Sequence, residues 1–459
     1  MKRLFYTLLF FLPCMLIACG GSDDTPDGDN NPPVVAPPSE EPVDSRLLYN
    51  GIRLPEQWPP VRSSSSELEK GMSPFYLSDK PSVINISVGR QLFVDNFLIE
   101  STNLKRTFYY PEYYSGNPIL TPEQDWEKTG TKGAAFAAPF SDGVWYDEKE
   151  GKYKMWYMAG GGSYATSGAG VTCYAESTDG IHWTKPTLSV VAGTNIVDYN
   201  SERDASVIWL DKQESNASKR YKMFLVARES GKWRYHYKTS PDGKVWRAAV
   251  QSEPIADRST VYKNPFRNVW VYSMRHNVRV DANKLVRARD YNENTDPEAG
   301  TKKAEALLSA FWFGPWANEQ HHTDYPNIAP AIYNQDATPY ESIMLGFFSV
   351  WQGPENDVCA SDNVIKRNQV MVGYSRDGYS WFREDMNPFH AVNTTTSDAW
   401  NQGNLQSVAG APLIVGDKLY FYLSGRRLRG TQEITTTGLA MLRRDGFASM
   451  KGTGELQTS

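Results

Sequence analysis

The residues best suited to chemistry are four aspartates that each stand at the start of a predicted β-strand: Asp142, Asp204, Asp257 and Asp324. A fifth strand of the same kind starts with Asn404 and Gln406. Carboxylates that converge repel one another, so at least one pKa rises and the set divides into an acid and a base, as glycoside hydrolysis requires. An aspartate at a strand start also commonly caps the entry turn. Because four of them occupy the same position, we favour chemistry for the set.

A separate general acid is harder to place. Glu355 is the first choice, because the Gly-Pro before it breaks a strand and can turn its carboxylate inward. An exposed loop glutamate is the alternative interpretation. His276, His321 and His322 are rival acids, and His322 ranks next, although a lone histidine is more often structural.

Three arginines accompany these aspartates. Arg203 precedes Asp204, Arg258 follows Asp257, and Arg275 ends a predicted strand. Neighbouring strand residues face opposite sides, so Arg203 and Asp204 cannot both enter one pocket without a bulge. An ion pair that joins strands is the structural alternative. Arginines that line a pocket together with Gln406 would predict a carboxylated or sulfated sugar, because guanidinium binds such oxyanions through two hydrogen bonds.

A short repeat predicts the elements that position these residues. S-T-D-G-I-H-W, S-P-D-G-K-V-W and S-R-D-G-Y-S-W contain Asp179, Asp242 and Asp377, and the weaker R-R-D-G-F contains Asp445. The intervals are 63, 135 and 68 residues, so the middle one holds two periods and the chain contains five units. Such a unit suits a four-stranded blade with each Asp-Gly at a tight hairpin turn. We therefore predict an all-β fold, a five-bladed β-propeller over residues 89–459, in which the repeat itself is structural.

The phase of this repeat links the fold to the chemistry. Inner strands of a propeller line a central channel, so the four aspartates should meet at one mouth of it. Residues 46–88 are expected to form an N-terminal extension outside the propeller. The strand-like G-R-Q-L-F-V-D-N-F-L-I that follows is expected to complete the last blade and close the ring.

The N-terminus predicts export and a lipid anchor. Residues 1–18 join a basic start to an apolar run too short for a comfortable membrane span, and L-I-A-C ends at Cys19, so they resemble a bacterial lipoprotein signal peptide. Cys19 would carry the lipid. The next residues, G-G-S-D-D, resemble the export tag of Bacteroidetes surface lipoproteins, and residues 19–45 form a predicted disordered tether. We expect an outer-membrane lipoprotein at the cell surface, with the periplasmic face as the alternative.

Composition narrows the partners. The 459 residues carry a formal net charge of −5 without a long basic stretch, which argues against nucleic acid as a partner. The 14 tryptophans and 26 tyrosines suit both β-blades and sugar faces. No cluster of cysteine and histidine has zinc spacing, so we expect no metal or cofactor, although a Ca²⁺ held mainly by water would leave little trace. Cys173 and Cys359 are expected to be two buried thiols, and nothing predicts an oligomeric state.

Three motifs carry a family resemblance: G-N-P-I-L-T-P-E-Q-D-W, F-S-D-G-V-W-Y-D-E-K-E-G-K-Y-K-M-W-Y and S-E-R-D-A-S-V-I-W. Together they resemble the five-bladed glycosidases and phosphorylases of glycoside hydrolase families 32, 43, 68, 117 and 130, over about residues 116–447. The resemblance implies that Asp142 is the nucleophile or base and that Asp204 supports the transition state. S-D-G stands where N-D-P-N-G would mark a retaining fructosidase, and the glutamate expected after blade two as general acid is not evident. The resemblance to family 117 implies a histidine in that role.

The residues and the resemblance together predict an exo-acting glycoside hydrolase that releases a terminal sugar from a plant or algal polysaccharide. Glu355 would protonate the leaving oxygen, Asp142 would attack or activate water, and Asp204 would stabilise charge. Two alternatives remain open. One is a surface glycan-binding lipoprotein without turnover, and the other is a glycoside phosphorylase.

Overall fold

The computed structural model describes most of the chain after residue 43. The described residues are 44–68, 70–128, 134–165, 170–199, 201–280, 282, 284–396, 398–429 and 432–458. The predicted signal peptide, Cys19 and nearly all of the predicted tether lie outside them, so those predictions stay predictions. Within the described ranges, no helix is both long and apolar enough to cross a membrane.

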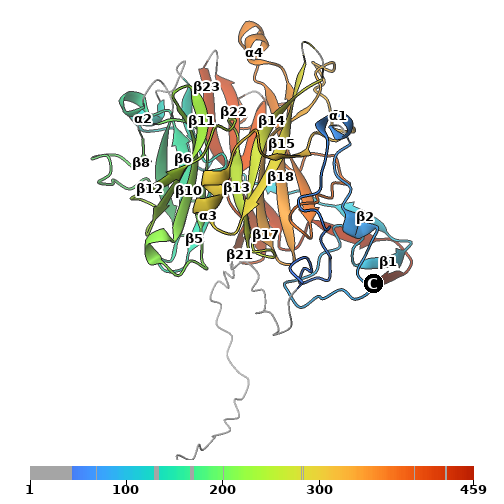
Figure 1. The fold of residues 1–459 in the computed structure, drawn as a ribbon. Coiled ribbons are helices and arrows are strands. Elements are labelled where there is room, and N and C mark those ends of the chain that lie inside the picture. Colours follow the sequence, from blue (N-terminus) through green and yellow to red (C-terminus); the bar gives the residue numbers. More distant parts are fainter. Residues whose placement is uncertain are drawn as a thin grey trace, which may run out of the picture.

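The fold is built mainly of antiparallel β-strands, which confirms the predicted all-β class (Figure 1). The antiparallel pairings fall into five successive groups, each with a first strand from which the others follow outward. Group one holds β4 (Ala135–Ala138), β5 (Val144–Asp147), β6 (Lys152–Ala159), β7 (Val171–Ser177) and β8 (Ile196–Asp198); group two holds β9 (Glu202–Leu210), β10 (Tyr221–Glu229), β11 (Lys232–Ser240) and β12 (Arg247–Gln251). Group three holds β13 (Thr260–Asn264), β14 (Val269–Arg279), β15 (Leu285–Asn294) and β16 (Ala310–Phe313); group four holds β17 (Ala331–Tyr340), β18 (Ile343–Gly353) and β19 (Arg367–Ser375). Group five holds β20 (Asn404–Val408), β21 (Leu413–Val415), β22 (Lys418–Arg429), β23 (Gln432–Arg443) and β3 (Glu112–Tyr113).

The remaining elements are short. Two small sheets pair β1 (Ile99–Thr102) with β25 (Leu456–Thr458) and β2 (Lys105–Phe108) with β24 (Ala448–Lys451). The α-helices are α1 (Ser64–Glu67), α2 (Asp125–Lys128), α3 (Pro297–Lys303) and α4 (Asn356–Asp362), and the 3₁₀ turns are η1 (Phe75–Leu77), η3 (Gly162–Tyr164) and η5 (Ala217–Lys219).

The five groups contact one another in sequence, and the fifth returns to the first. β9 contacts β5 and β13, β13 contacts β17, β19 pairs with β20, and β23 pairs in parallel with β4. The N-terminal chain completes group five as expected, but it does so through β3 and Leu120, not through residues 89–99. The earlier segment is held differently, because buried Asp95 forms an ion pair with buried Arg376 at 2.8 Å.

The S-x-D-G repeat forms the same turn three times. In the turn at Asp242, the Ser240 hydroxyl accepts from the backbone N–H of Gly243, and the Asp242 carboxylate accepts from the next two N–H groups. The glycine has φ +77, a left-handed conformation that glycine adopts at little cost. The turns at Asp179 and Asp377 repeat these contacts.

Each repeat turn also docks onto the preceding group. The glycine carbonyl accepts a hydrogen bond from an aromatic side chain there: Tyr422 to Gly180, Trp156 to Gly243 and Tyr262 to Gly378, at 2.8, 2.6 and 3.2 Å. The turn at Asp445 differs, because Asp445 itself has φ +60 and its carboxylate accepts from Tyr340 of group four at 2.6 Å. The described residues of group three do not form this turn, and there α3 packs against β11 and β12 of group two.

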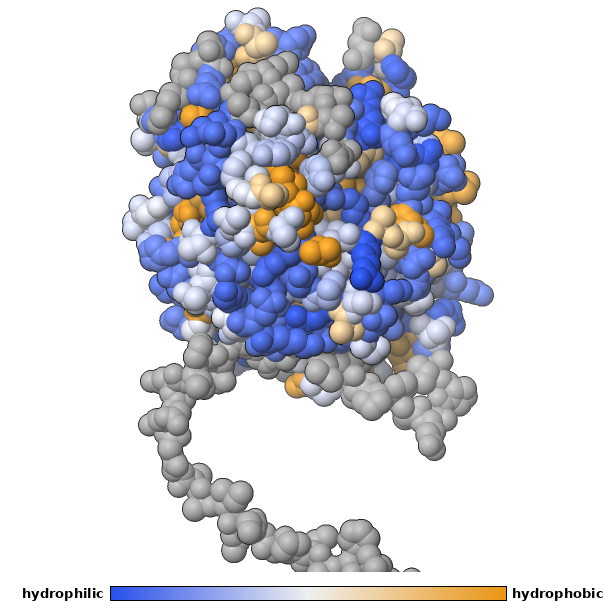
Figure 2. All heavy atoms as spheres, turned by 90° about the vertical axis from the view of Figure 1, so that its left-hand side faces the viewer, coloured by the Kyte–Doolittle hydropathy of each residue, from blue (hydrophilic) through white to orange (hydrophobic). Residues whose placement is uncertain are grey.

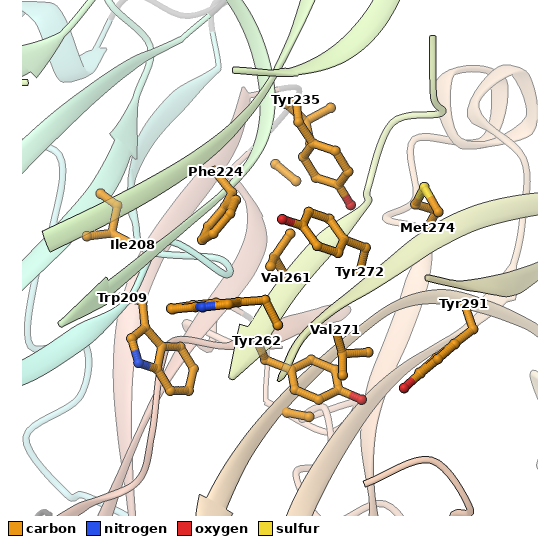
Figure 3. Packing of buried hydrophobic residues seen from close by; sticks show 14 of the residues in the cluster. Ile208, Trp209, Phe224, Tyr235, Val261, Tyr262, Val271, Tyr272, Met274 and Tyr291 are labelled. Carbon is orange, nitrogen blue, oxygen red and sulfur yellow. The ribbon is translucent and has the colours of Figure 1, made fainter. Parts of the chain in front are cut away.

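Aromatic side chains fill the space between neighbouring groups. Phe224 of group two lies 5.5 Å from Trp270 and 6.1 Å from Tyr272 of group three, measured between ring centroids, and Tyr235 lies 5.7 Å from Tyr272 (Figure 3). The face that carries α2, β8 and β12 is in contrast mainly hydrophilic, with small separate hydrophobic areas (Figure 2). The aromatic residues counted in the sequence therefore serve mostly as core.

Replacing the turn glycine tests how strongly the docking stabilises the fold. Gly243→Ala would place Cβ 2.3 Å from the Trp156 ring, so we expect a loss of about 3 kcal/mol in the free energy of unfolding, from backbone strain plus overpacking. Gly231→Ala is the matched control, since Gly231 has φ +80 but nothing within 4 Å of the added Cβ. Urea unfolding of both variants should show the larger loss for Gly243→Ala, and equal losses would contradict the docking role.

Candidate active site

Strained backbone marks one end of the first strands. Phe140 between β4 and β5, Arg258 before β13 and Ser407 in β20 have φ of +45, +54 and +68, although none is glycine. Such conformations cost about 1–3 kcal/mol each and cluster at functional sites. The three positions come from groups one, three and five, so the strain is shared by segments far apart in the sequence.

Four cationic side chains gather over two aromatic rings at this end. The Arg258 guanidinium lies 5.5 Å from the ring centroids of both Phe140 and Tyr333. Arg287 and Lys366 lie 4.8 and 5.7 Å from the Tyr333 centroid, and Arg426 lies 5.6 Å from that of Phe140. We call Arg258, Arg287, Lys366, Arg426, Phe140 and Tyr333 the cationic cluster.

Tyr333 is the residue of the cationic cluster whose pKa moves towards neutral pH. Burial raises the pKa of its phenol, but Arg258, Lys366 and Arg287 outweigh burial and lower the pKa to about 8. The register of β17 against β18 shifts between Ile332 and Asn334, so Tyr333 sits at a bulge, which redirects a side chain out of the regular alternation. A phenol of this kind can exchange its proton close to neutral pH.

Asp336 lies three residues further along β17. Its carboxylate accepts from the Asn334 amide at 3.1 Å and from the Val408 N–H of β20 at 3.2 Å. Burial raises the pKa of Asp336 to about 7, because these hydrogen bonds only partly offset the loss of water. No local pattern predicts Tyr333 or Asp336, because neither stands where a strand is expected to begin; a carboxylate inside an otherwise buried strand is the available signal.

Asp142 and Arg203 form a buried ion pair between groups one and two. The guanidinium donates to both carboxylate oxygens, at 2.6 and 3.1 Å, and also to the Thr172 hydroxyl at 2.6 Å. Asp142 is fully buried, and burial raises its pKa although Arg203 acts in the opposite direction. Arg203 therefore has the geometry of an ion pair that joins two strands, which was the alternative interpretation of this arginine. Asp142 faces Arg203 instead of an open pocket.

Asp204 and Asp257 each hold an arginine. Asp204 accepts from the backbone N–H of Arg258 at 2.8 Å and from its guanidinium at 2.9 Å. Asp257 forms an ion pair with Arg275 at 2.5 Å. Arg203 points to group one and Asp204 to group three, and the register of β9 against β10 shifts between Arg203 and Ser206, so a bulge accompanies this pair of neighbours. Asp204 thus fixes Arg258 over Tyr333.

Asp324 does not occupy the predicted position. It is exposed in the connection before β17, which begins only at Ala331, so the prediction that it starts a strand is wrong. The proline at 326 and the polar residues around it favour a loop over a strand. The first strand of group four instead carries its aspartate at Asp336.

None of the three candidate histidines takes part in the cation–ring contacts of the cationic cluster. His322 is buried and accepts from the backbone N–H of Asp324, and burial together with Arg367 lowers its pKa; His321 is exposed. His276 contacts Asp290 at 2.9 Å, and that contact raises the pKa of His276. These contacts are those of structural histidines, and a catalytic role for His276 or His322 stays a prediction.

Glu355 is exposed at the N-cap position of α4, at the top of Figure 1, and makes no side-chain capping bond. Its role as the acid stays a prediction. Asn404 and Gln406 are buried at the start of β20, where the amide atoms of both lack a hydrogen-bond partner among the described residues. Cys173 is a buried free thiol and Cys359 a half-buried one. No group of three or more His, Cys, Asp or Glu in the described ranges could hold a metal ion.

Comparisons with known proteins give a distant likeness. No protein-family model matches the chain, and no curated protein matches it. Among solved structures, the chain is similar to a glycoside hydrolase at a TM-score of 0.45 and 13% identity, over 74% of this chain and 94% of that one. It is similar to a glycosyl hydrolase from Bacteroides ovatus (TM-score 0.40, 13% identity, 75% and 97% covered) and to a fructofuranosidase from Schwanniomyces occidentalis (0.40, 11%, 74% and 64%). A likeness of this size does not assign a function.

The raised pKa of Asp336 makes stability depend on pH. The stabilisation is present below the ordinary carboxyl pKa and is lost as pH rises through about 7, so unfolding free energy should fall by about 3 kcal/mol from about pH 5 to about pH 8 through this group. Asp336→Asn should remove that part of the pH dependence, whereas Asp357→Asn, at an exposed position, should retain it. Urea unfolding at both pH values checks this, and an unchanged slope in Asp336→Asn would contradict it.

The Asp142–Arg203 pair can be tested as a structural unit. Asp142→Asn leaves the buried Arg203 charge without its carboxylate and should cost about 3–5 kcal/mol of unfolding free energy. The double variant Asp142→Asn/Arg203→Met should recover much of that loss. Thermal unfolding of the three proteins measures it, and a fully stable Asp142→Asn would point back to chemistry for this residue.

Proposed function

We propose that the protein is an exo-acting glycoside hydrolase that removes a terminal sugar from a plant or algal polysaccharide. In this proposal the five strand groups are the blades of a five-bladed β-propeller, and the cationic cluster lies at one mouth of its channel. The observation that carries the proposal is the pair Tyr333 and Asp336, two groups on one strand whose pKa values of about 8 and about 7 suit proton transfer near neutral pH.

Asp336 is the proposed general acid. Its carboxyl keeps a proton to about pH 7 and would donate that proton to the glycosidic oxygen as the bond to C1 breaks. The Tyr333 phenolate would accept a proton from the water that adds to C1, so that the released sugar gains a hydroxyl and the leaving group gains a hydrogen. Asp204 contributes by holding Arg258, whose charge favours the phenolate. Glu355 is the rival acid.

A glycoside phosphorylase is the second candidate, because a cluster of four cations could hold phosphate in place of water. Turnover that depends on inorganic phosphate would distinguish it from hydrolysis.

We also propose that Cys19 carries a lipid that anchors the protein to the outer membrane, with residues 19–45 as tether. The active site would then face polysaccharide outside the cell. Metabolic labelling with a fatty acid, lost in Cys19→Ala, tests the anchor.

Activity of three variants tests the assignment. On a polysaccharide panel, release of monosaccharide by wild type should fall about 1,000-fold or more in Tyr333→Phe and in Asp336→Asn, since each loses a proton-transfer group. Glu355→Gln should stay close to wild type. A large loss in Glu355→Gln with little loss in Asp336→Asn would return the acid role to Glu355. Glycan binding without sugar release in any protein would favour the non-catalytic binder.

A further inference from the structure

We infer that the cationic cluster and the buried amides beside it form a pocket that selects a sugar with one carboxylate or sulfate, the anion bound by Arg287 and Lys366 and the hydroxyls bound by amides of groups four and five. This rests on the proposed function and names the class of its substrate. The amides are those of Asn368, Asn404 and Gln406.

The cations of the cluster are not equally neutralised. Arg258 is paired with Asp204, and Arg426 is paired with Glu433 at 2.8 Å. Arg287 and Lys366 take part in no ion pair formed by described residues, although both are half-buried beside the Tyr333 ring. Charges withdrawn from water need a counter-charge, and the phenol of Tyr333 is ionised only above about pH 8. At lower pH an anionic ligand can supply that charge.

The amide half of the pocket has the opposite deficiency. Asn368 and Asn404 are fully buried and Gln406 is 1% exposed, yet neither polar atom of any of the three amides has a hydrogen-bond partner within the described chain. An unsatisfied buried polar atom costs about 1–3 kcal/mol, so proteins rarely tolerate several together. Each amide offers a donor and an acceptor, and a sugar hydroxyl can accept a hydrogen bond from the one and donate a hydrogen bond to the other.

The two halves adjoin. Asn368 pairs with Asn404 across the contact of β19 and β20, and Asn404 lies opposite Arg426 in β22. Arg426 covers Phe140, which Arg258 also covers, and Lys366 precedes Asn368 by two residues in the chain. A ligand that satisfies both halves needs one negative group and several hydroxyls on a small ring. Inorganic phosphate or sulfate would satisfy the cations alone, and a neutral sugar the amides alone.

Binding measurements on the full mature chain test the selection. The probes are glucuronate, galacturonate and glucose 6-sulfate, matched with glucose, galactose and inorganic sulfate, in isothermal titration calorimetry. We expect at least one acidic sugar to bind about tenfold or more tightly than its neutral match and than inorganic sulfate. Equal binding of acidic and neutral sugars, equal binding of inorganic sulfate, or no binding of any acidic sugar would overturn the inference.

Two variants separate the halves. Arg287→Gln should abolish the preference for the acidic sugar and leave binding of the neutral one, whereas Gln406→Leu should weaken both about equally. Arg247→Gln, at an exposed position on β12, is the control and should match wild type. A preference that survives Arg287→Gln would overturn the inference. A Gln406→Leu variant that binds both sugars as wild type does would overturn the amide half.

The inference and the proposed function fail in different ways. Cleavage of neutral polysaccharides only would keep the hydrolase and overturn the anionic substrate. Selective binding of an acidic sugar without cleavage of any polysaccharide would keep the pocket and overturn the hydrolase.

Discussion

The hydrogen bond from an aromatic side chain to the carbonyl of a turn glycine in the next strand group holds this fold together. Tyr422, Trp156 and Tyr262 each donate to a turn that lies far away in the sequence. Tyr340 makes the equivalent contact by donating to the carboxylate of Asp445. Each bond contributes only about 1 kcal/mol. These hydrogen bonds matter mainly because they are directional, since each one fixes the angle at which one strand group packs against the next. An added Cβ would lie 2.3 Å from the Trp156 ring at Gly243 and 2.7 Å from the Tyr422 hydroxyl at Gly180, so glycine keeps the donor in place at these two turns.

Docking of this kind brings the first strands together, and the cationic cluster and three residues of positive φ lie where they meet. Phe140, Arg258 and Ser407 hold unfavourable backbone conformations there because the surrounding sheets leave them no other. Arg258 is then fixed twice over by Asp204, through its backbone and through its guanidinium. Arg203 is similarly held by Asp142. These aspartates thus position arginines, and one of those arginines, Arg258, is among the three cations that lower the pKa of Tyr333.

The sequence predicted the fold better than it predicted the candidate active site. Periodic S-x-D-G-x-x-W motifs depend on local turn chemistry, so the turns at Asp179, Asp242 and Asp377 and the all-β class followed from them directly. The same spacing located Asp204, Asp257 and Gln406 near strand starts. It failed at Asp324, because group four has a long connection before β17 that the repeat does not measure. Arg287 of β15, Tyr333 of β17 and Lys366 just before β19 meet only through packing, so no local pattern identifies them. Closure through β3 was also missed, since a two-residue strand has no periodicity.

Tyr333 and Asp336 show why burial alone does not decide the protonation state of a buried group. Both are buried on β17, and desolvation raises both pKa values. For Asp336 the neighbours are the Ser141 hydroxyl, one backbone N–H and the neutral Asn334 amide, together with a more distant Arg289, so desolvation prevails and the acid keeps its proton. For Tyr333 three cations stabilise the phenolate more than burial opposes it. An Asp and a Tyr ordinarily differ by about six pKa units, and the two environments bring them to within about one. A strand that passes from the cationic cluster into a neutral polar interior can therefore supply a proton donor and a proton acceptor that work at the same pH.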